Sequence, residues 1–566
     1  MVLILLSWLY TFFTSITLGI GFARLFQVKS LNVVITCILG LFGVTLLAGS
    51  WAIFGPISIE FHVFLLGTSI GLGYYYKTNL KAIVVNTFIQ LSSFSLLTKV
   101  LLAFSSLLIL GQSATLPFII DNETYYIQTI QWLNEYGFVP GLANLHLFLG
   151  QTSGWHITQS VYSFSFLYDG FNDLNGYLLL MANFWAFQKL HSYFTNGNRL
   201  DLTFGLLPLT YVFLFQFVSA PSPDLPVYLI AMLVFSMYLK PTQDEALEKF
   251  NLTTILVLFA IYIKITAVVL LVLPFLLLTK HFIHFKNQLV PIRLLGGLVL
   301  FLFAIKNIML TGYPLYPLPF FPYSSADYVV PMDIMSYFFG QEMMHSFYMG
   351  FGTFERASFF DLIKQYFLHS GIDSIMGLAT LFLLIISPFI ISKYYPKQKL
   401  HNIYYVFITL LILLVFSSPQ YRFYIYFTIF FGLVFLSVLF TQKKLILGIL
   451  SLSFIVVGIF VFVPISFRAL THNKLLENNS TLHFENIIYP QPNTKEKHDY
   501  TKIVKGNLEY QSPSKAKLFW ITGNGNLPCV NEEQLDYFET HFHVVPQVRG
   551  KTLGEGFYAQ KTKNHD

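Results

Sequence analysis

Charged residues are scarce in this sequence. Asp, Glu, Lys and Arg together make up 11% of its 566 residues, whereas hydrophobic residues make up 55%. A soluble domain needs far less apolar material, because its surface must stay largely polar. The two cysteines, Cys37 and Cys529, lie in an apolar run and in the polar C-terminal region, so no disulfide framework is expected. The scarcity of charge therefore excludes an ordinary soluble protein and indicates an all-α protein that crosses a membrane many times.

Apolar runs long enough to cross a membrane recur along most of the chain. The first run has no basic segment before it, so we expect it to be retained as a span rather than cleaved. The region 251–279 is too long for one span and is interrupted by Lys264, so we expect two short helices that meet at this lysine. The total is about 12 to 14 transmembrane helices. The other predicted spans are 2–23, 31–51, 61–76, 92–112, 172–188, 202–219, 224–239, 292–310, 372–392, 402–417, 421–440 and 445–466.

Basic residues fall on alternate connections between these runs, which predicts the orientation of the chain. Short connections rich in Lys and Arg face the cytoplasm according to the positive-inside rule. The outer side then receives two long loops, 113–157 and 311–371, and the polar C-terminal region 467–566. That region is long enough for a small extracytoplasmic domain. The residues assigned to the cytoplasmic side are Arg24, Lys29, Lys77, Lys81, Lys189, Arg199, Lys240, Lys249, Lys280, Lys286, Arg293, Lys393, Lys397, Lys399, Lys443 and Lys444.

The outer segment 113–157 contains no Lys or Arg but carries two neighbouring acids in the sequence "DNETYY". Asp121 opens a predicted helix, on which it shares one face with Tyr125. A carboxylate at this position can be a simple helix cap. It can equally be a general base at the mouth of a membrane cavity, because polar and aromatic groups follow it. Glu123 offers a second carboxylate close by.

The later part of the same segment, "GLANLHLFLGQTSGWHITQS", contains three residues that suit the binding of a substrate. Trp155 can stack on a sugar ring, and His146 and His156 can bond a hydroxyl or hold a metal. The separation of the two histidines matches no common metal motif. An interfacial loop with aromatic anchors is the alternative interpretation of all three residues.

Three basic residues break the alternation and map to the outer half of the membrane. Lys264, Lys306 and Arg422 lie in or beside apolar runs, where a cation is costly and usually paired or functional. Lys306 and Arg422 can instead extend to the interface. Asp224, in "SAPSPDLPVYL", opens a span on the same side, either as a cap or as a second carboxylate beside Asp121. Together these residues could bind an anionic lipid phosphate and activate a hydroxyl.

A Pro- and Tyr-rich stretch, "TGYPLYPLPFFPYSSADYVVPMD", follows the span at 292–310. Its prolines exclude regular helix, so we expect an irregular outer loop. Tyr313, near its start, is a candidate for substrate contact in a lid or an acceptor platform.

These segments bear a resemblance to a known superfamily. An acid in the first large outer loop, followed by "ETYYIQTIQWLNEYG", resembles the GT-C superfamily of membrane glycosyltransferases, and "SAPSPD", "IKIT", "TGYPLYP" and "SSPQYRF" are similar to features of its bacterial members. "GLANLH", "TGYPLYP" and the pattern "LPC…RG…GFY" also look like an uncharacterised family of bacterial multi-spanning proteins. The similarity covers roughly 92–440, with extra helices at 1–91 and a last span at 441–466.

The resemblance implies a GT-C-like fold and a multi-pass enzyme of the bacterial cytoplasmic membrane. Such an enzyme moves a sugar from a polyprenyl-phosphate-linked donor to a hydroxyl of a glycan, lipid or protein on the outer face, with inversion. Many members have two adjacent acids, whereas Asn122 separates Asp121 from Glu123 here, so either acid can be the base. A divalent cation is used by some members and not by others, and nucleic acid is not an expected partner.

The resemblance also implies roles for the remaining candidates. Lys264, Lys306 and Arg422 would hold the donor phosphate. The expected substrate-binding residues are Tyr125, His146, Trp155, His156, Asp224 and Tyr313.

Two other classes of membrane protein use similar features. A transporter or flippase of lipid-linked saccharides also needs outer cations and broken helices, but it usually has repeated halves, and this chain has no evident repeat. An O-antigen polymerase or ligase relies on basic residues in large outer loops, whereas the loop 113–157 has none.

Overall fold

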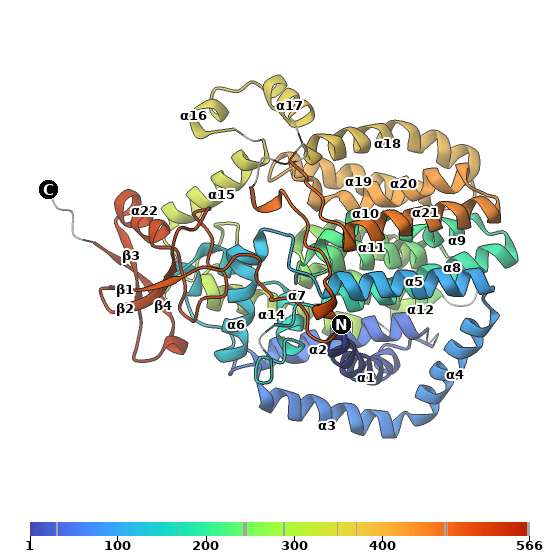
Figure 1. Ribbon diagram of the computed structural model, residues 1–566, viewed down its shortest axis with the longest axis horizontal. Coiled ribbons are helices and arrows are strands. Elements are labelled where there is room, and N and C mark those ends of the chain that lie inside the picture. The colour runs from blue at the N-terminus through green and yellow to red at the C-terminus, as the bar shows by residue number, and fades with distance from the viewer. Residues whose placement is uncertain are drawn as a thin grey trace.

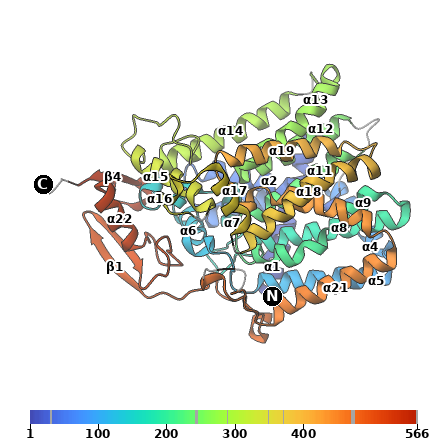
Figure 2. The same cartoon turned by 90° about the horizontal axis from the view of Figure 1, so that it is seen from above.

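Long helices form one bundle in the computed structural model, and a small domain with strands covers one end of it (Figure 1). Viewed from above, the strands and α22 (Glu532–Phe542) again lie at one end, and α9 (Arg199–Gly205) lies at the other (Figure 2). The structure describes residues 1–29, 32–168, 170–240, 246–286, 289–347, 349–369, 371–468, 471 and 474–562.

Eight helical segments among the described residues are long and apolar enough to cross a membrane, and four apolar helices are shorter. This confirms the prediction of a helical protein with segments suited to a bilayer. The shorter ones are α11 (Asp224–Leu239), Ile265–Lys280, α19 (Leu400–Val415) and α20 (Ile425–Leu439). The longer ones are α1 (Val2–Leu25), α2 (Val33–Trp51), α5 (Leu96–Ser113), Arg199–Phe217, α12 (Ala246–Ile263), α14 (Val290–Thr311), α18 (Ile372–Tyr394) and α21 (Lys443–Phe462).

The predicted span at 172–188 forms α8 (Leu174–Asn196), which is less apolar than its neighbours. Its polar side chains are bonded inside the bundle. Asn175 is fully buried, and its Nδ2 donates to the carbonyl oxygens of Phe217 at 2.8 Å and Ala220 at 2.7 Å. A helix surrounded by protein can carry such residues because they are bonded away from lipid.

The first two helices pack at very short range on account of two glycines. A Cβ on Gly19 would lie 1.9 Å from the Thr36 carbonyl oxygen, and one on Gly40 would lie 1.7 Å from that of Ser15. Small residues permit this approach in membrane bundles. On its other side α2 stacks Phe42 on Phe259 of α12, with ring centroids 4.8 Å apart. Helices α1 and α2 of the predicted extra unit 1–91 are therefore part of the main bundle.

The predicted break at Lys264 is confirmed. Helix α12 ends at Ile263, Lys264 is extended, and the 3-10 helix η6 (Ile265–Leu271) leads into α13 (Val272–Phe285). Helix α12 is 18 residues long and so can cross a membrane alone, which corrects the expectation of two short helices.

A helix that the sequence analysis did not anticipate, α4 (Lys77–Ser93), joins α3 (Ile59–Tyr75) to α5. It turns across the end of the bundle away from the C-terminal domain (Figure 1). Of its residues Ile83 is the one buried, so it lies at the edge of the bundle and not within it.

The segment between α5 and α8 is folded into the protein. It contains a π-helical turn η1 (Asn122–Tyr126), α6 (Ile127–Glu135), the 3-10 turns η2 (Leu142–Asn144) and η3 (Leu147–Gln151), and α7 (Gly154–Val161). All residues of η1 and α7 are buried. The predicted outer loop 113–157 is therefore a buried layer between the bundle and the C-terminal domain.

The second long loop is irregular up to residue 331, as its prolines predicted. It then forms α15 (Met332–Ser346), α16 (Phe351–Phe354) and α17 (Phe359–Leu368). A separate hydrophobic cluster joins this loop to the C-terminal domain and includes Tyr313, Ile334, Phe338, Phe538 and Val544.

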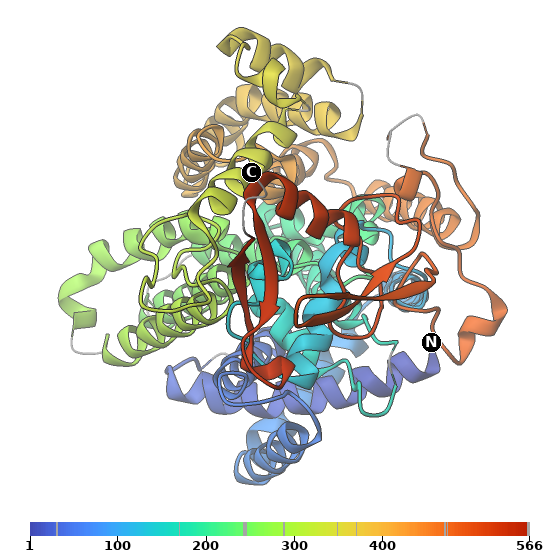
Figure 3. The same ribbon diagram turned by 90° about the vertical axis from the view of Figure 1, so that its left-hand side faces the viewer.

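The C-terminal domain is mixed rather than all-α. Strands β1 (Tyr500–Lys505) and β2 (Leu508–Pro513) form one antiparallel pair, in which Ile503 faces Tyr510. Strands β3 (Val544–Val548) and β4 (Phe557–Lys561) form another, with α22 before β3. Seen end-on, this domain stands in front of α6 and the middle of the bundle (Figure 3).

Candidate functional site

Four charged side chains from four separate segments form two ion pairs. Arg422 lies in the 3-10 turn η8 (Tyr421–Phe423), and its Nη1 is 2.7 Å from Oδ2 of Asp121, which directly precedes η1. Asp224 is the first residue of α11 and pairs with Lys264 at the helix break. The residues predicted to share the outer side of the membrane are thus brought together in pairs.

The ring of Phe423 joins the two pairs into one group. Lys264 Nζ lies 4.4 Å from the ring centroid, and Arg422 Cζ lies 5.5 Å from it. Both distances are within the range of cation–π attraction. We call Asp121, Asp224, Lys264 and Arg422 the ion-pair cluster.

Charged groups of both ion pairs affect the pKa of Tyr125. Burial raises the pKa of its hydroxyl well above the usual value. The Asp121 and Asp224 carboxylates raise that pKa further, and the Arg422 guanidinium lowers it. Charges of both pairs therefore act on the Tyr125 hydroxyl. The Tyr125 ring stacks on that of Phe148, with ring centroids 5.4 Å apart.

The two pairs differ in access to solvent. The exposed fraction is 20% for the Asp121 side chain and 32% for Arg422, against 3% for Asp224 and 18% for Lys264. A group that exchanges protons with a substrate hydroxyl must be reachable. Asp121 therefore suits that role, and Asp224 suits the support of Lys264.

Neighbouring side chains hold the Asp121–Arg422 pair in place. Tyr126 donates its hydroxyl to Asp121 Oδ2 at 3.3 Å, the same oxygen that Arg422 contacts. Arg422 Nε donates to Gln420 Oε1 at 2.6 Å, and Tyr228 donates to the Arg422 carbonyl oxygen at 2.8 Å. Both charged groups are thus oriented before any ligand binds.

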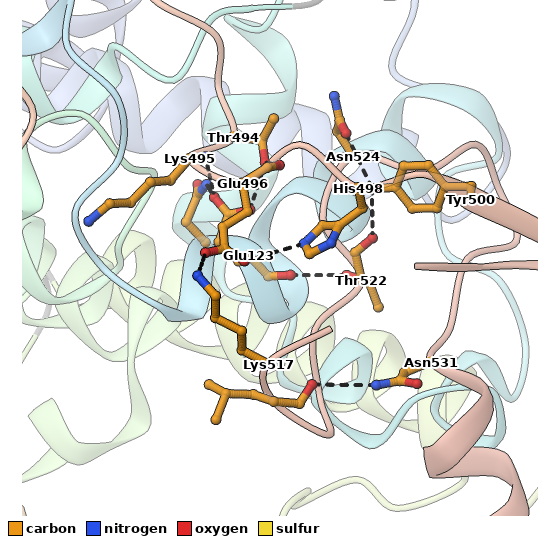
Figure 4. A network of polar contacts seen from close by, with 12 residues as sticks. Glu123, Thr494, Lys495, Glu496, His498, Tyr500, Lys517, Thr522, Asn524 and Asn531 are labelled. Atoms are coloured by element: carbon orange, nitrogen blue, oxygen red, sulfur yellow. Dashed lines mark hydrogen bonds and ion pairs between the residues drawn. The ribbon is translucent and has the colours of Figure 1, made fainter. Parts of the chain in front are cut away.

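Glu123 lies in a different environment, facing the C-terminal domain (Figure 4). Its Oε2 accepts the Thr494 hydroxyl at 2.6 Å, and its Oε1 accepts the Lys495 backbone N–H at 2.8 Å. Burial raises the pKa of this carboxyl, and the bonds from Thr494 and Lys495 lower it.

The backbone of Glu123 also bonds to the C-terminal domain. Its carbonyl oxygen accepts the N–H groups of Thr522 at 3.0 Å and Gly523 at 2.8 Å. Positions two apart on a helical turn point to opposite sides, which explains why Asp121 and Glu123 face different partners. Glu123 therefore anchors the C-terminal domain, and Asp121 is the acid of this turn that belongs to the ion-pair cluster.

Lys306 is not in contact with the ion-pair cluster among the described residues. It is buried on α14, where its Nζ donates to the Thr152 carbonyl oxygen at 2.5 Å and to Asn307 Oδ1 at 2.7 Å. This corrects the expectation that it belongs with Lys264 and Arg422, because its charge is used to hold the η3–α7 segment.

His156 packs against the two tyrosines that adjoin the cluster. Its ring centroid is 4.7 Å from that of Tyr126 and 5.9 Å from that of Tyr125. Burial, and then the charge of Lys306, lower its pKa to about 3, so the ring is neutral. Its Nδ1 accepts the Ser153 N–H at 3.2 Å, which places the ring hydrogen on Nε2.

Three other predicted substrate contacts are enclosed by protein. Trp155 has no exposed surface and donates Nε1–H to Asn175 Oδ1 at 2.6 Å. His146 is equally buried and bonds the Trp520 carbonyl oxygen at 3.2 Å, with its pKa lowered to about 4 by burial. The Tyr313 hydroxyl donates to the Val330 carbonyl oxygen at 2.9 Å. Trp155, His146 and Tyr313 therefore have structural roles, because each side chain is buried and hydrogen-bonded within the chain.

Sequence reasoning did not single out Phe423 or Tyr126. The run "SSPQYRF" contained a signal for the first, because an aromatic residue next to a membrane cation is a common partner. No group of three or more His, Cys, Asp or Glu side chains in the described ranges is arranged to hold a metal ion.

Comparison with known proteins gives a family but no activity. No curated protein and no solved structure matches the chain. A family model does match residues 1–429, which include the whole ion-pair cluster and exclude the C-terminal domain. The chain therefore belongs to the family described as Domain of unknown function (DUF8201).

Proposed function

We propose that the chain is an integral membrane glycosyltransferase of the GT-C type. It moves a sugar from a polyprenyl-phosphate-linked donor to an acceptor hydroxyl on the outer face of the bacterial cytoplasmic membrane, with inversion. The observation that carries this proposal is the ion-pair cluster at the ends of apolar helices. Ionisable groups beside membrane-spanning segments are costly and generally serve a function.

The location of the cluster supports the proposal. Asp224 begins α11 and Lys264 follows the end of α12, so both lie where these helices leave the apolar region. A lipid-linked donor keeps its polyprenyl chain in the bilayer and presents its phosphate and sugar at this level. Two cations near one ring suit a phosphate there, Arg422 as a bidentate donor and Lys264 as a point charge.

The proposed reaction uses Asp121 as the general base. The carboxylate takes the proton of the acceptor hydroxyl as its oxygen bonds to the anomeric carbon of the sugar. The bond from that carbon to the phosphate oxygen breaks at the same time, and polyprenyl phosphate leaves with the electron pair. Lys264 and Arg422 stabilise the charge that grows on the phosphate.

The observed pairing implies how the site is activated. Arg422 holds Asp121 in the free protein, at 2.7 Å. A donor phosphate that engages Arg422 competes for this guanidinium and releases Asp121 to accept a proton. Asp224 is buried against Lys264 and keeps that cation in position throughout.

The experiment is transfer of a labelled sugar from a polyprenyl-phosphate donor by the full chain in proteoliposomes. Removing a general base lowers a rate by about 100- to 10,000-fold, which is the effect expected of Asp121→Asn. Asp327→Asn is a matched control, because Asp327 also pairs with an arginine, Arg549, at 2.9 Å, but on the exposed surface. Equal transfer by the Asp121→Asn variant and the wild type would remove Asp121 from the mechanism.

A further inference from the structure

Helix α17, which precedes the candidate span α18, has an apolar side and a polar side. Phe359, Ile363 and Tyr366 share one side, because positions three, four and seven apart lie on the same face of a helix. Asp361 and Lys364 belong to the other side. A helix with this distribution of side chains suits a boundary between apolar and polar surroundings.

The C-terminal part of the apolar side is packed against α18. A Cβ on Gly377 of α18 would lie 3.2 Å from Cε1 of Tyr366 and 3.4 Å from Cε1 of Phe367. The hydroxyl of Ser374, also on α18, donates to the Tyr366 carbonyl oxygen at 3.2 Å. These contacts fix one end of α17 on the first turns of α18.

The N-terminal part of the apolar side extends beyond these contacts and is exposed. Phe359 is 63% exposed, Phe360 is 79% exposed, and Ile363 is exposed as well. The two phenylalanine rings lie together, with centroids 6.2 Å apart. Apolar surface left in water costs about 25 cal/mol per Å². An exposed patch of this kind marks a site of contact with a membrane or another protein.

The neighbouring surface of α18 favours lipid as the partner. Its exposed apolar residues recur at intervals of three and four, which places them on one side of a helix suited to cross a membrane. That side faces lipid once the helix is in a bilayer. Helix α17 adjoins its first turns at the margin of the bundle (Figure 1). The exposed residues of α18 on this side are Ile375, Leu378, Phe382, Ile385 and Phe389.

A bond to the turn before η8 places α17 at the end of the bundle that carries the ion-pair cluster. The Tyr366 hydroxyl donates to the Pro419 carbonyl oxygen at 2.8 Å and also contacts the Tyr424 hydroxyl. Arg422 of the cluster lies between Pro419 and Tyr424 in the chain. The exposed patch of α17 is therefore near the level at which the helices leave the apolar region.

We propose that α17 is an interfacial helix, which lies in the lipid leaflet beside the ion-pair cluster. Phe359, Phe360 and Ile363 insert among the upper parts of the acyl chains, while Asp361 and Lys364 stay at the level of the headgroups and water. Amphipathic helices with aromatic residues on the apolar side bind bilayers in this way. The inference is independent of the proposed glycosyl transfer, because it concerns contact with lipid alone.

The test measures the depth of single fluorescent labels on the full chain in phosphatidylcholine liposomes. The label is attached to Phe359→Cys or, as a matched control on the polar side, to Lys364→Cys. Both native cysteines are buried, so the wild type gives the background of labelling. One quencher is a phospholipid with a nitroxide near the headgroup end of its acyl chain, and the other is aqueous iodide. At position 359 we expect about threefold stronger quenching by the lipid, and about threefold weaker quenching by iodide, than at position 364.

A second label position tests whether the phenylalanines hold the helix in the lipid. With the label on Ile363→Cys, the added change Phe359→Ser/Phe360→Ser should raise quenching by iodide about threefold. Adding Lys364→Ser instead should leave the quenching unchanged. Equal quenching by iodide at positions 359 and 364 would overturn the proposal, because the apolar side would then be in water. Protection of position 359 from both quenchers would also overturn it, since a protein partner or a second copy would then cover this side. An unchanged signal at position 363 after loss of both phenylalanines would contradict their role.

Discussion

The two ion pairs of the cluster should respond very differently to loss of their acids. The side chains of Asp224 and Lys264 are 3% and 18% exposed, so Asp224→Asn leaves a largely buried ammonium without its partner. Breaking a buried pair in this way costs about 3–5 kcal/mol. Asp121 and Arg422 are 20% and 32% exposed, so water can replace the lost carboxylate. For Asp121→Asn we therefore expect a cost of about 1 kcal/mol or less.

The double variant Asp224→Asn/Lys264→Met separates charge from packing. It removes the stranded cation, so the free energy of unfolding should return to within about 1 kcal/mol of the wild type. The assay is equilibrium unfolding of the full chain in mixed detergent micelles, with helical circular dichroism as the signal. Equal stability of the two single variants would contradict this prediction, as would a double variant no more stable than Asp224→Asn.

Three further predictions concern the surroundings of the cluster. Acidification from about pH 7 to about pH 5 should reduce the free energy of unfolding by about 2 kcal/mol through His146, because burial lowers the pKa of this residue from 6.5 to about 4. This contribution to stability is complete above the unfolded-state pKa. It is lost as the pH falls toward the folded-state pKa. His146→Gln should reduce the slope of stability against pH without abolishing it, because His156, whose pKa burial also lowers, acts in the same range; an unchanged slope would count against the prediction. Glu123→Gln places an amide donor opposite the Thr494 hydroxyl or the Lys495 N–H, at a cost of about 1–2 kcal/mol. Limited proteolysis near residue 495 should therefore be roughly tenfold faster. The control Glu485→Gln, at an exposed position, should leave the rate of proteolysis unchanged. Phe423→Leu should lower the free energy of unfolding by about 1 kcal/mol because both cations lose the ring, and Phe423→Tyr, which keeps it, should not.

Some of the site could be predicted from the sequence because membranes constrain charge strongly. Lys264 interrupts an apolar region, and a cation at such depth requires a break in the helix or a partner; the structure has both. The alternation of basic connections placed Asp121, Lys264 and Arg422 on one side. Their pairing followed from a physical need, since each unpaired charge beside lipid is costly.

Other features depended on contacts between distant segments, which local patterns do not encode. Glu123 and Asp121 look equivalent in "DNETYY", and they differ because Thr494 and Lys495, far along the chain, engage only Glu123. Trp155 likewise has the composition of a sugar platform, but Asn175 of α8 and the surrounding helices enclose it.

The same reason explains the errors at Lys306 and α4. Lys306 sits in an apolar run like Lys264, yet it is bonded to its neighbour Asn307 and to the backbone carbonyl oxygen of Thr152, and no sequence pattern identifies the latter. Helix α4 carries Lys77 and Lys81, which indicated a short cytoplasmic connection rather than a helix across the end of the bundle.

We propose above that the ion-pair cluster transfers a sugar with inversion. The most direct measurement is the anomeric configuration of the product, determined by nuclear magnetic resonance after the wild-type chain reacts with a polyprenyl-phosphate sugar of known configuration. We expect a new glycosidic bond of the opposite configuration. A product with retained configuration would contradict it, as would movement of the lipid-linked saccharide between leaflets without formation of a glycosidic bond.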